Sequence, residues 1–271
     1  ARRRGDARGD PVRGATTEMW SGRFRQPLDA GFGRWQRSFD FDRRLLREEL
    51  AASRAHAAAL KNAGVLTSSE LITILQGLKQ IGEKAAASPA FLDDSEAEDV
   101  HHFVEKQLVG LIGDTGYKLH SGRSRNVQIA TDLRLYVRAA IDQIRADLAE
   151  WLSIFLDRAE QAGSAAMPAY THLQRAEPVL VAHGLLAYVE MFLRDADRLA
   201  DCRKRLNLSP LGSGAVAGAQ LPLDRLARAD ELGCDATTVT TTAARRCRAS
   251  PLGVVGRPPL LPAAPSSACA P

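Results

Sequence analysis

One continuous stretch, His120–Gln174, decides the fold: HSGRSRNVQIATDLRLYVRAAIDQIRADLAEWLSIFLDRAEQAGSAAMPAYTHLQ. Its middle part carries apolar residues three or four positions apart, which is the spacing of one face of an α-helix. A helix from near Val127 to near Ala162 would be roughly 50 Å long at about 1.5 Å per residue. Such a rod predicts a large helical bundle. The apolar positions are Leu133, Val137, Ile141, Ile144, Leu148, Leu152 and Phe155.

Two polar runs bracket the predicted rod. Ser121–Asn126 offers two guanidinium groups, two hydroxyls and an amide at a helix N-terminus, where backbone N–H groups and the helix dipole favour an anion. A solvated loop with Asn126 as an ordinary cap is an equally good interpretation. Thr171–Gln174 places the imidazole of His172 between two hydrogen-bonding side chains, and histidine is the natural proton carrier near neutral pH. A structural histidine is at least as good an interpretation of that run alone.

Composition favours a helical protein of the cytoplasm. Ala and Leu dominate the 271 residues, and alternating Val/Ile/Thr runs are almost absent, which favours helix over sheet. The net charge of +4 comes from the ends: residues 1–18 have five Arg against three acids and residues 233–271 four Arg against one Asp, which leaves about −1 elsewhere. Nucleic acid is therefore not an expected partner. The most apolar window, Val179–Leu193, is too short and too polar to span a membrane.

The chain divides into four predicted parts. Thr67 and Glu70 have capping-box spacing at the start of one helix, and a second long helix is predicted from about Glu177 to Leu206, with Pro178 in its first turn. The four cysteines lack zinc or CxxC spacing, which favours a reducing compartment. We expect a disordered leader at 1–18, an N-terminal helical domain at 19–118, a partial central helical bundle at 119–232 and an unrelated, disordered tail at 233–271.

Three further histidines have competing interpretations. Ser95–His101 contains enough carboxylates around His101 to be a metal-ligand cluster. We prefer an acid-rich first helical turn that complements the helix dipole, at least for Glu96. His56 and His183 lie in or beside helical stripes and are expected to be packing residues.

Six runs carry a resemblance to a known family. They are Trp20–Phe24 (WSGRF), Ser38–Asp42 (SFDFD), Glu98–His101 (EDVH), Leu119–Asn126 (LHSGRSRN), Tyr170–Pro178 (YTHLQRAEP) and Ser209–Ala215 (SPLGSGA). In this order they closely resemble the argininosuccinate lyases, of the fumarase/aspartase superfamily, over about Met19 to Gly233. The resemblance implies an all-α, fumarase/aspartase-type fold, in which an N-terminal helical domain is followed by an incomplete long-helix bundle.

The resemblance also implies a reaction. Argininosuccinate would be split by β-elimination into arginine and fumarate, with no metal or organic cofactor. His172 would be the acid–base histidine or would orient that partner, with Thr171 beside it in the catalytic group. By family analogy the protein would be a homotetramer whose active sites are shared between subunits. The residues expected to bind the substrate are Ser38, Asp99, His101, Ser124, Arg125, Asn126 and Gln174.

The sequence departs from the family pattern in two places. Val127 stands where the family has an acid, so we expect weaker substrate placement and a less firmly held Arg125. The family's mobile Gly-Ser-rich loop, which supplies the serine assigned as the base, is not found. Residues 233–271 take its place, so we expect the 271-residue chain to be inactive or nearly so. The alternatives are a non-catalytic, crystallin-like or binding protein on the same scaffold, and another fumarate-releasing lyase of the superfamily.

Overall fold

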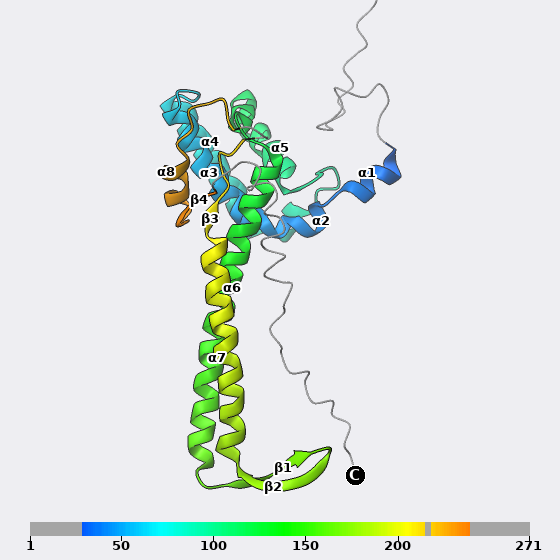
Figure 1. The fold of residues 1–271 in the computed structure, drawn as a ribbon. Helices are drawn as coiled ribbons and strands as arrows, with labels where there is room; N and C mark the ends of the chain where they lie inside the picture. Colours follow the sequence, from blue (N-terminus) through cyan, green and yellow to red (C-terminus); the bar gives the residue numbers. More distant parts are fainter. Residues whose placement is uncertain (1–28, 215–217, 239–271) are drawn as a thin grey trace, which may run out of the picture.

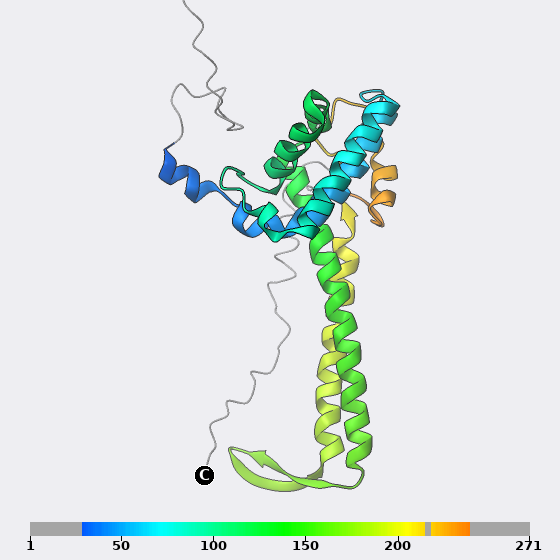
Figure 2. The same ribbon diagram turned by 180° about the vertical axis from the view of Figure 1, so that it is seen from behind.

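The computed structural model describes residues 29–214 and 218–238, which form a helical head with a long rod projecting from it (Figures 1 and 2). The head comprises residues 29–124, 207–214 and 218–238, and the rod is made of two long helices. The leader, the Trp20–Phe24 run and the predicted tail from residue 239 onward lie outside the described residues. Within the described ranges, no helix combines the length and the apolar character needed to cross a membrane.

The head is a cluster of helices around one apolar core. The rings of Phe39 and Phe103 stack at its centre with their centroids 4.9 Å apart, and leucines and isoleucines from three helices bury their side chains around them. The capping box is confirmed, because Glu70 N donates to Thr67 Oγ1 (3.2 Å) and Thr67 N donates to the Glu70 carboxylate (2.9 Å). The elements are α1 (Ala30–Gln36), α2 (Phe39–Asp42), η2 (Arg43–Leu45), α3 (Leu46–Asn62), α4 (Ser68–Ala87), η3 (Pro89–Leu92), α5 (Val100–Ile112) and η4 (Gly113–His120).

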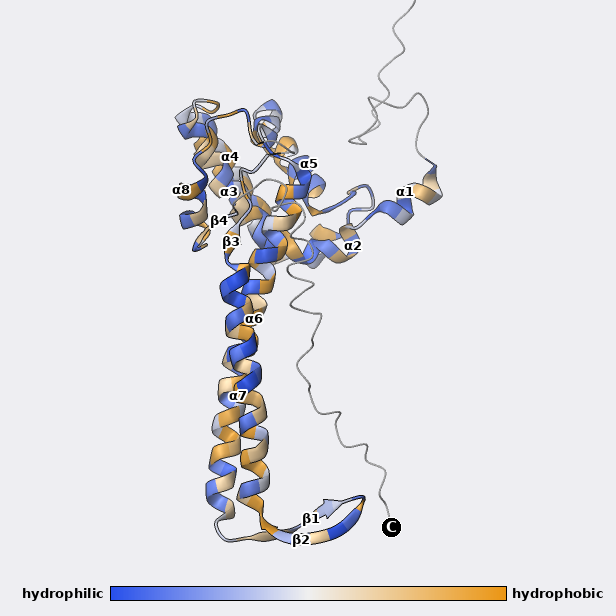
Figure 3. Ribbon diagram, viewed as in Figure 1, coloured by the Kyte–Doolittle hydropathy of each residue, from blue (hydrophilic) through white to orange (hydrophobic). Residues whose placement is uncertain are grey.

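The rod consists of α6 (Arg125–Ala162) and α7 (Val181–Leu206), which run alongside each other in opposite directions (Figure 1). The predicted helix from near Val127 to near Ala162 is confirmed to within two residues. Trp151 packs edge-on against Phe192 with the ring centroids 5.9 Å apart. The half of the rod far from the head is rich in apolar residues (Figure 3). Several of its large apolar side chains, among them Trp151, Ile154 and Leu186, are nevertheless exposed. A two-helix rod therefore leaves apolar surface uncovered, as in a bundle that lacks its other helices.

The connection between the two rod helices differs from the prediction. It is an antiparallel hairpin of β1 (Ala166–Thr171) and β2 (Gln174–Leu180), so the second long helix begins at Val181 and not near Glu177. Pro178 lies in β2 opposite Pro168 and not in a first helical turn. The two prolines, which have no N–H to donate, thus share one position of the ladder. His183 near the start of α7 is exposed, so our expectation that it is a packing residue is wrong for the single chain.

The chain after α7 folds back onto the head. β3 (Leu208–Ser209) pairs in parallel with β4 (Ala236–Thr237), and α8 (Arg225–Glu231) packs against α3. Arg138 of α6 fixes this return, because its guanidinium donates to the carbonyl oxygens of Leu232 and Gly233, both at 2.8 Å. Residues 233–238, the first part of the predicted tail, thus belong to the packed head.

Candidate substrate-binding site

Two predicted binding residues meet where α5 and α6 begin. Asp99 is the N-cap of α5, and its carboxylate accepts a hydrogen bond from His102 N at 2.7 Å. The second carboxylate oxygen of Asp99 lies 3.2 Å from Nε of Arg125, the first residue of α6. The ion pair ties two helix N-termini together, and N-termini attract anions because their N–H groups and dipoles point outward.

Ser38 joins the same place through Asp42, which the sequence analysis did not assign to the site. Ser38 Oγ donates to Asp42 Oδ2 at 2.6 Å, and Val100 N donates to Asp42 Oδ1 at 3.0 Å. Burial raises the pKa of Asp42, while the hydrogen bond from Ser38 acts in the opposite direction. We call Ser38, Asp42, Asp99 and Arg125 the N-terminal corner. Its motif signal was present, since Asp42 ends the SFDFD run.

The other two predicted residues of the Ser121–Asn126 run lie at the start of α6. Ser124 is the N-cap residue and Asn126 lies inside the first helical turn. Our alternative interpretation, in which Asn126 is the cap, is therefore wrong. Both side chains are half-buried and lie beside Arg125 in the chain. The structure thus links Ser38, Asp99 and Arg125 at the two helix N-termini, with Ser124 and Asn126 on either side of Arg125 in the chain.

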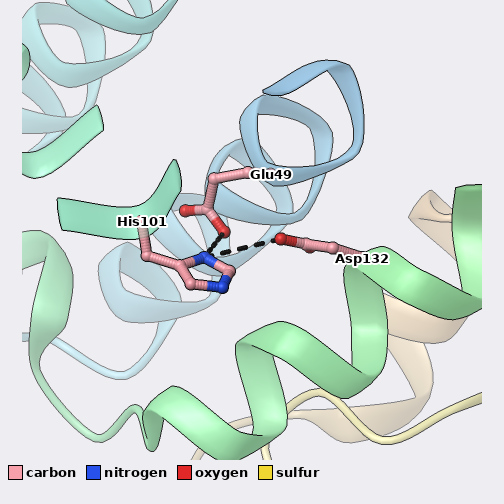
Figure 4. Close-up of side chains that lie close together, drawn as sticks. All are labelled: Glu49, His101 and Asp132. Carbon is pink, nitrogen blue, oxygen red and sulfur yellow. Dashed lines mark hydrogen bonds and ion pairs between the residues drawn. The ribbon is translucent and has the colours of Figure 1, made fainter. Parts of the chain in front are cut away.

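His101, also predicted to bind substrate, is buried, and the carboxyl groups of Glu49 and Asp132 both approach the same nitrogen of its ring (Figure 4). Its Nδ1 lies 2.7 Å from Glu49 Oε2 and 3.5 Å from Asp132 Oδ2, and its side chain is 1% exposed. The other oxygen of Glu49 accepts from Arg123 Nη2 at 3.0 Å. We call Glu49, His101, Arg123 and Asp132 the buried cluster. A direct contact between His101 and substrate stays a prediction.

Three members of the buried cluster could in principle hold a metal ion. The ligand atoms of Glu49, His101 and Asp132 lie within 4.8 Å of one another. The guanidinium of Arg123 already supplies the positive charge that Glu49 requires. Within the Ser95–His101 run, Glu96 instead pairs with Lys106 at 2.7 Å. Because α5 begins only at Val100, our interpretation of Glu96 as part of its first turn is wrong.

The two carboxyl groups of the buried cluster have opposite protonation preferences. Burial raises the pKa of Asp132 well above its usual value, and the negative charge of Glu49 raises it further. Burial also acts to raise the pKa of Glu49, but the nearby Arg123 and His101 outweigh it and hold that pKa below its usual value. The ionised form is therefore favoured at Glu49 and the protonated form at Asp132.

Asp132→Asn is expected to make the chain more stable at neutral pH. The folded state keeps a proton on Asp132 that the unfolded chain releases above about pH 4, so wild-type stability falls by up to about 1.4 kcal/mol per pH unit as the pH rises toward the folded pKa. Asparagine needs no proton and avoids this loss. Urea unfolding between about pH 5 and pH 8 measures the difference, which should grow with pH.

The control for this experiment is Asp142→Asn. The hydrogen bond and charge of Arg203 lower the pKa of Asp142, so its contribution is present above its unfolded pKa and is lost only in acid. This variant should lose a little stability at neutral pH. An Asp132→Asn chain that is less stable than wild type at pH 8 would contradict the assignment of a neutral Asp132.

The predicted catalytic residues lie at the opposite end of the rod. Thr171 and Gln174 pair as the last and first residues of β1 and β2. His172 and Leu173 form the turn between them, with φ of +50° and +61°. Such left-handed conformations cost roughly 1–2 kcal/mol per residue for side chains other than Gly, Asn or Asp. All four side chains are exposed, and Leu173 is 94% exposed.

One chain therefore does not bring its two groups of predicted site residues together. The 38 residues of α6 at about 1.5 Å each span about 57 Å, and the hairpin lies beyond the far end of that helix (Figure 1). Two chemistries are thus separated: fixed cations and N–H donors at the head, and an exposed imidazole at the hairpin turn.

Val127 lies behind the corner in the apolar interior. It is 2% exposed and belongs to a cluster with Ala55, Leu211 and Leu232. Arg125, two residues earlier, is paired with Asp99 in spite of the missing acid. The expected effect of Val127 on substrate placement stays a prediction. His56, next to Ala55, is fully buried with Nε2 2.9 Å from the carbonyl oxygen of Ser121, which confirms its packing role.

Comparison with known proteins gives concordant matches. A model of the family described as lyase matches residues 22–250. The argininosuccinate lyase of Koribacter versatilis is 59% identical over 83% of this chain and 48% of its own length. That of Acidobacterium capsulatum is 61% identical over 77% of this chain and 44% of its own length. A solved structure of an EDDS lyase variant with bound fumarate superposes with a TM-score of 0.66 at 27% identity, over 81% of this chain and 44% of that one. The chain spans about half the length of the curated relatives it matches.

Proposed function

The chain belongs to the lyase family, whose model matches most of its length, and from this premise we propose that the protein is an argininosuccinate lyase. It would be a carbon–nitrogen lyase that splits argininosuccinate into arginine and fumarate, as a step of arginine biosynthesis in the cytoplasm. The observation that carries the proposal is the N-terminal corner, where the Asp99–Arg125 ion pair joins two helix N-termini beside Ser38. The high identity to two argininosuccinate lyases supports the choice of substrate.

The corner has the donors that a dicarboxylate requires. The guanidinium of Arg125 can bind a carboxylate through charge-assisted hydrogen bonds, and the N-terminus of α6 favours an anion through the helix dipole. Ser124 and Asn126 add short polar side chains at that N-terminus. The succinyl part of argininosuccinate carries two carboxylates. We assign it to this corner.

The proposed reaction is a β-elimination. A base removes the proton from the carbon next to one carboxylate, and the electron pair moves into that carboxylate to give an aci-carboxylate. The intermediate then expels the guanidino nitrogen, which an acid protonates, and the products are fumarate and arginine. His172 would act as the acid–base group or orient it, with Thr171 and Gln174 beside it. Fixed donors at the corner would stabilise the charge that develops on the carboxylate.

A complete site would need more than one copy of the chain. Since α6 separates the hairpin from its own corner, the hairpin of one subunit would reach the corner of another. The exposed apolar residues of the rod, among them Ile144, Trp151 and Leu193, would be covered by helices of neighbouring subunits. We therefore propose a homotetramer built around these rods.

The test is fumarate release from argininosuccinate, followed by absorbance. Because the chain spans about half of its relatives, we would join residues 1–238 to the remaining half of the Koribacter versatilis enzyme, which is 59% identical in the shared part. This chimera should turn over argininosuccinate, whereas the 271-residue chain alone should be inactive or nearly so. A folded, tetrameric chimera without activity would contradict the proposal.

A panel of other succinyl amines should accompany argininosuccinate. The likeness to an EDDS lyase variant that holds fumarate makes another fumarate-releasing lyase the second candidate. Turnover of a different succinyl amine, with argininosuccinate left intact, would favour it. Tight binding of argininosuccinate without any turnover would favour a non-catalytic protein on this scaffold.

A further inference from the structure

The buried cluster presents one imidazole nitrogen to two carboxyl groups that have very different surroundings. Glu49 receives hydrogen bonds from Ser53 Oγ at 2.6 Å and Arg123 Nη2 at 3.0 Å, in addition to its contact with His101 Nδ1 at 2.7 Å. Both oxygens of Asp132 are buried, and neither accepts a hydrogen bond from the described residues. Nδ1 of His101 lies 3.5 Å from one of them, and the neighbouring Glu49 carboxylate favours a proton on Asp132 through its charge and a side-chain hydrogen bond. Two adjacent buried carboxylates do not both ionise, so the charge belongs on the one with the donors.

Glu49 also connects the elements that carry the N-terminal corner. It lies on α3, His101 lies on α5 two residues after Asp99, and Arg123 lies two residues before Arg125. Arg123 is held twice, because its guanidinium also donates to Ser53 Oγ at 2.9 and 3.0 Å. The side chain of Arg123 is 4% exposed, so it is directed into the protein and does not belong to the donors of the corner. Its contacts fix the chain at the point where α6 begins.

We propose that Glu49 is a positioning residue: as the only ionised carboxylate of the buried cluster it fixes His101 and Arg123, and through them the Asp99–Arg125 ion pair, while Asp132 serves as a neutral acid. Nδ1 of His101 then carries a proton and donates a hydrogen bond to Glu49. The ligand of the N-terminal corner rests on the proposed function. The arrangement of charges in the buried cluster does not depend on it.

The proposal predicts different effects on the buried cluster for two isosteric substitutions. Asp132→Asn replaces a neutral acid by a neutral amide and should leave the cluster intact. Glu49→Gln leaves a single acceptor oxygen for the three donors from Ser53, Arg123 and His101, and turns an N–H₂ group toward Arg123 or His101. With the charge of Glu49 removed, Asp132 should lose its proton and take over as the partner of His101. A side chain that merely fills space at position 49 would not change the protonation of Asp132.

The first arm of the experiment is spectroscopic and uses the full 271-residue chain. Nitrogen-15 NMR of the histidines should place a proton on Nδ1 of His101, and infrared spectra at pH 7 should show the carbonyl stretch of a protonated carboxyl. Asp132→Asn should remove that band and keep the Nδ1 proton, whereas Glu49→Gln should remove the band by ionising Asp132. If Glu49→Gln does not fold, the wild-type and Asp132→Asn spectra still decide. A wild-type chain without the acid band overturns the proposal.

The second arm is the affinity of the same chains for argininosuccinate, measured by calorimetry. Displacement of Arg125 by about 1 Å is expected to weaken binding about 10- to 100-fold in Glu49→Gln, while Asp132→Asn should stay within about threefold of wild type. Equal losses in the two variants would overturn the positioning role. If the wild-type chain binds no argininosuccinate, the spectra alone decide the role of Glu49, and turnover by the chimera decides the proposed function.

Discussion

In the chimera with the Koribacter versatilis half, His172→Asn is expected to lower kcat by a factor of about 10²–10⁴, which is the usual contribution of a positioned acid or base. Asparagine suits this position because it tolerates the left-handed backbone that His172 adopts, with φ of +50°, better than most side chains do. The hairpin turn should therefore keep its shape. Steady-state kinetics of fumarate release measure the effect.

Folding should hardly change in this variant, because the His172 side chain is exposed at the hairpin turn. The melting temperature of His172→Asn should thus match that of the parent chimera. His183→Asn is the matched control, since it also replaces an exposed histidine but lies in α7 outside the hairpin. A His172→Asn enzyme with undiminished kcat would remove His172 from the chemistry.

Val127→Asp is expected to lower the free energy of unfolding by about 3–4 kcal/mol, although it restores the acid that the family pattern has at this position. A carboxylate at a site that is 2% exposed among apolar side chains loses its hydration without a partner. Burial would raise the pKa of the new carboxyl group, so the folded form would favour its protonated state. The loss should therefore grow as the pH rises above about 4.

Val127→Ala separates the effect of charge from the effect of volume. It should cost roughly 2 kcal/mol for the lost methyl groups and the cavity, with no dependence on pH. Urea unfolding of both variants at two pH values makes the comparison. A Val127→Asp chain that is as stable as wild type and binds argininosuccinate more tightly would contradict this prediction, because its carboxylate would then be paired with a cationic group. That result would support the expectation that Val127 weakens substrate placement.

Those parts of the fold that depend on local pattern could be predicted from the sequence. The apolar spacing from Leu133 to Phe155 gave the long helix to within two residues, because a helix that buries one stripe must repeat about every 3.6 positions. The Thr67–Glu70 capping box was equally visible, since both its bonds join neighbours in the chain. In the N-terminal corner, Ser38 and Asp99 were indicated only by the family motifs, Arg125 also by the donor chemistry of its run, and Asp42 was not assigned.

The β1–β2 hairpin was not predicted because its sequence lacks a strand signal. Residues 166–180 contain two prolines, and nearly all of their side chains are exposed in the structure. Without a buried face, a strand shows no alternation of apolar and polar residues. The turn also lacks the Asn-Gly pair typical of two-residue hairpins, since His172 and Leu173 adopt its left-handed conformations instead.

The buried cluster could not be predicted for a different reason. Glu49 and His101 are 52 residues apart, and each lies in a helix whose pattern looks complete without the other. A buried charge gives no periodic signal, since it depends on which side chains meet in space. His101 was indicated as a binding residue by the family resemblance alone, and its contact with Glu49 could not be read from the sequence.

The clamp that Arg138 forms has a consequence for synthesis on the ribosome. Its guanidinium binds the carbonyl oxygen of Leu232, 94 residues later, and at about 5–20 residues per second the ribosome needs about 5–20 s to make that interval. During this delay α3 has no α8 beside it, and nascent α6 emerges with its apolar stripe bare. We expect chaperones that bind nascent chains to bind this polypeptide at that stage. At that point the rod has left the exit tunnel, but α8 has not yet packed against α3.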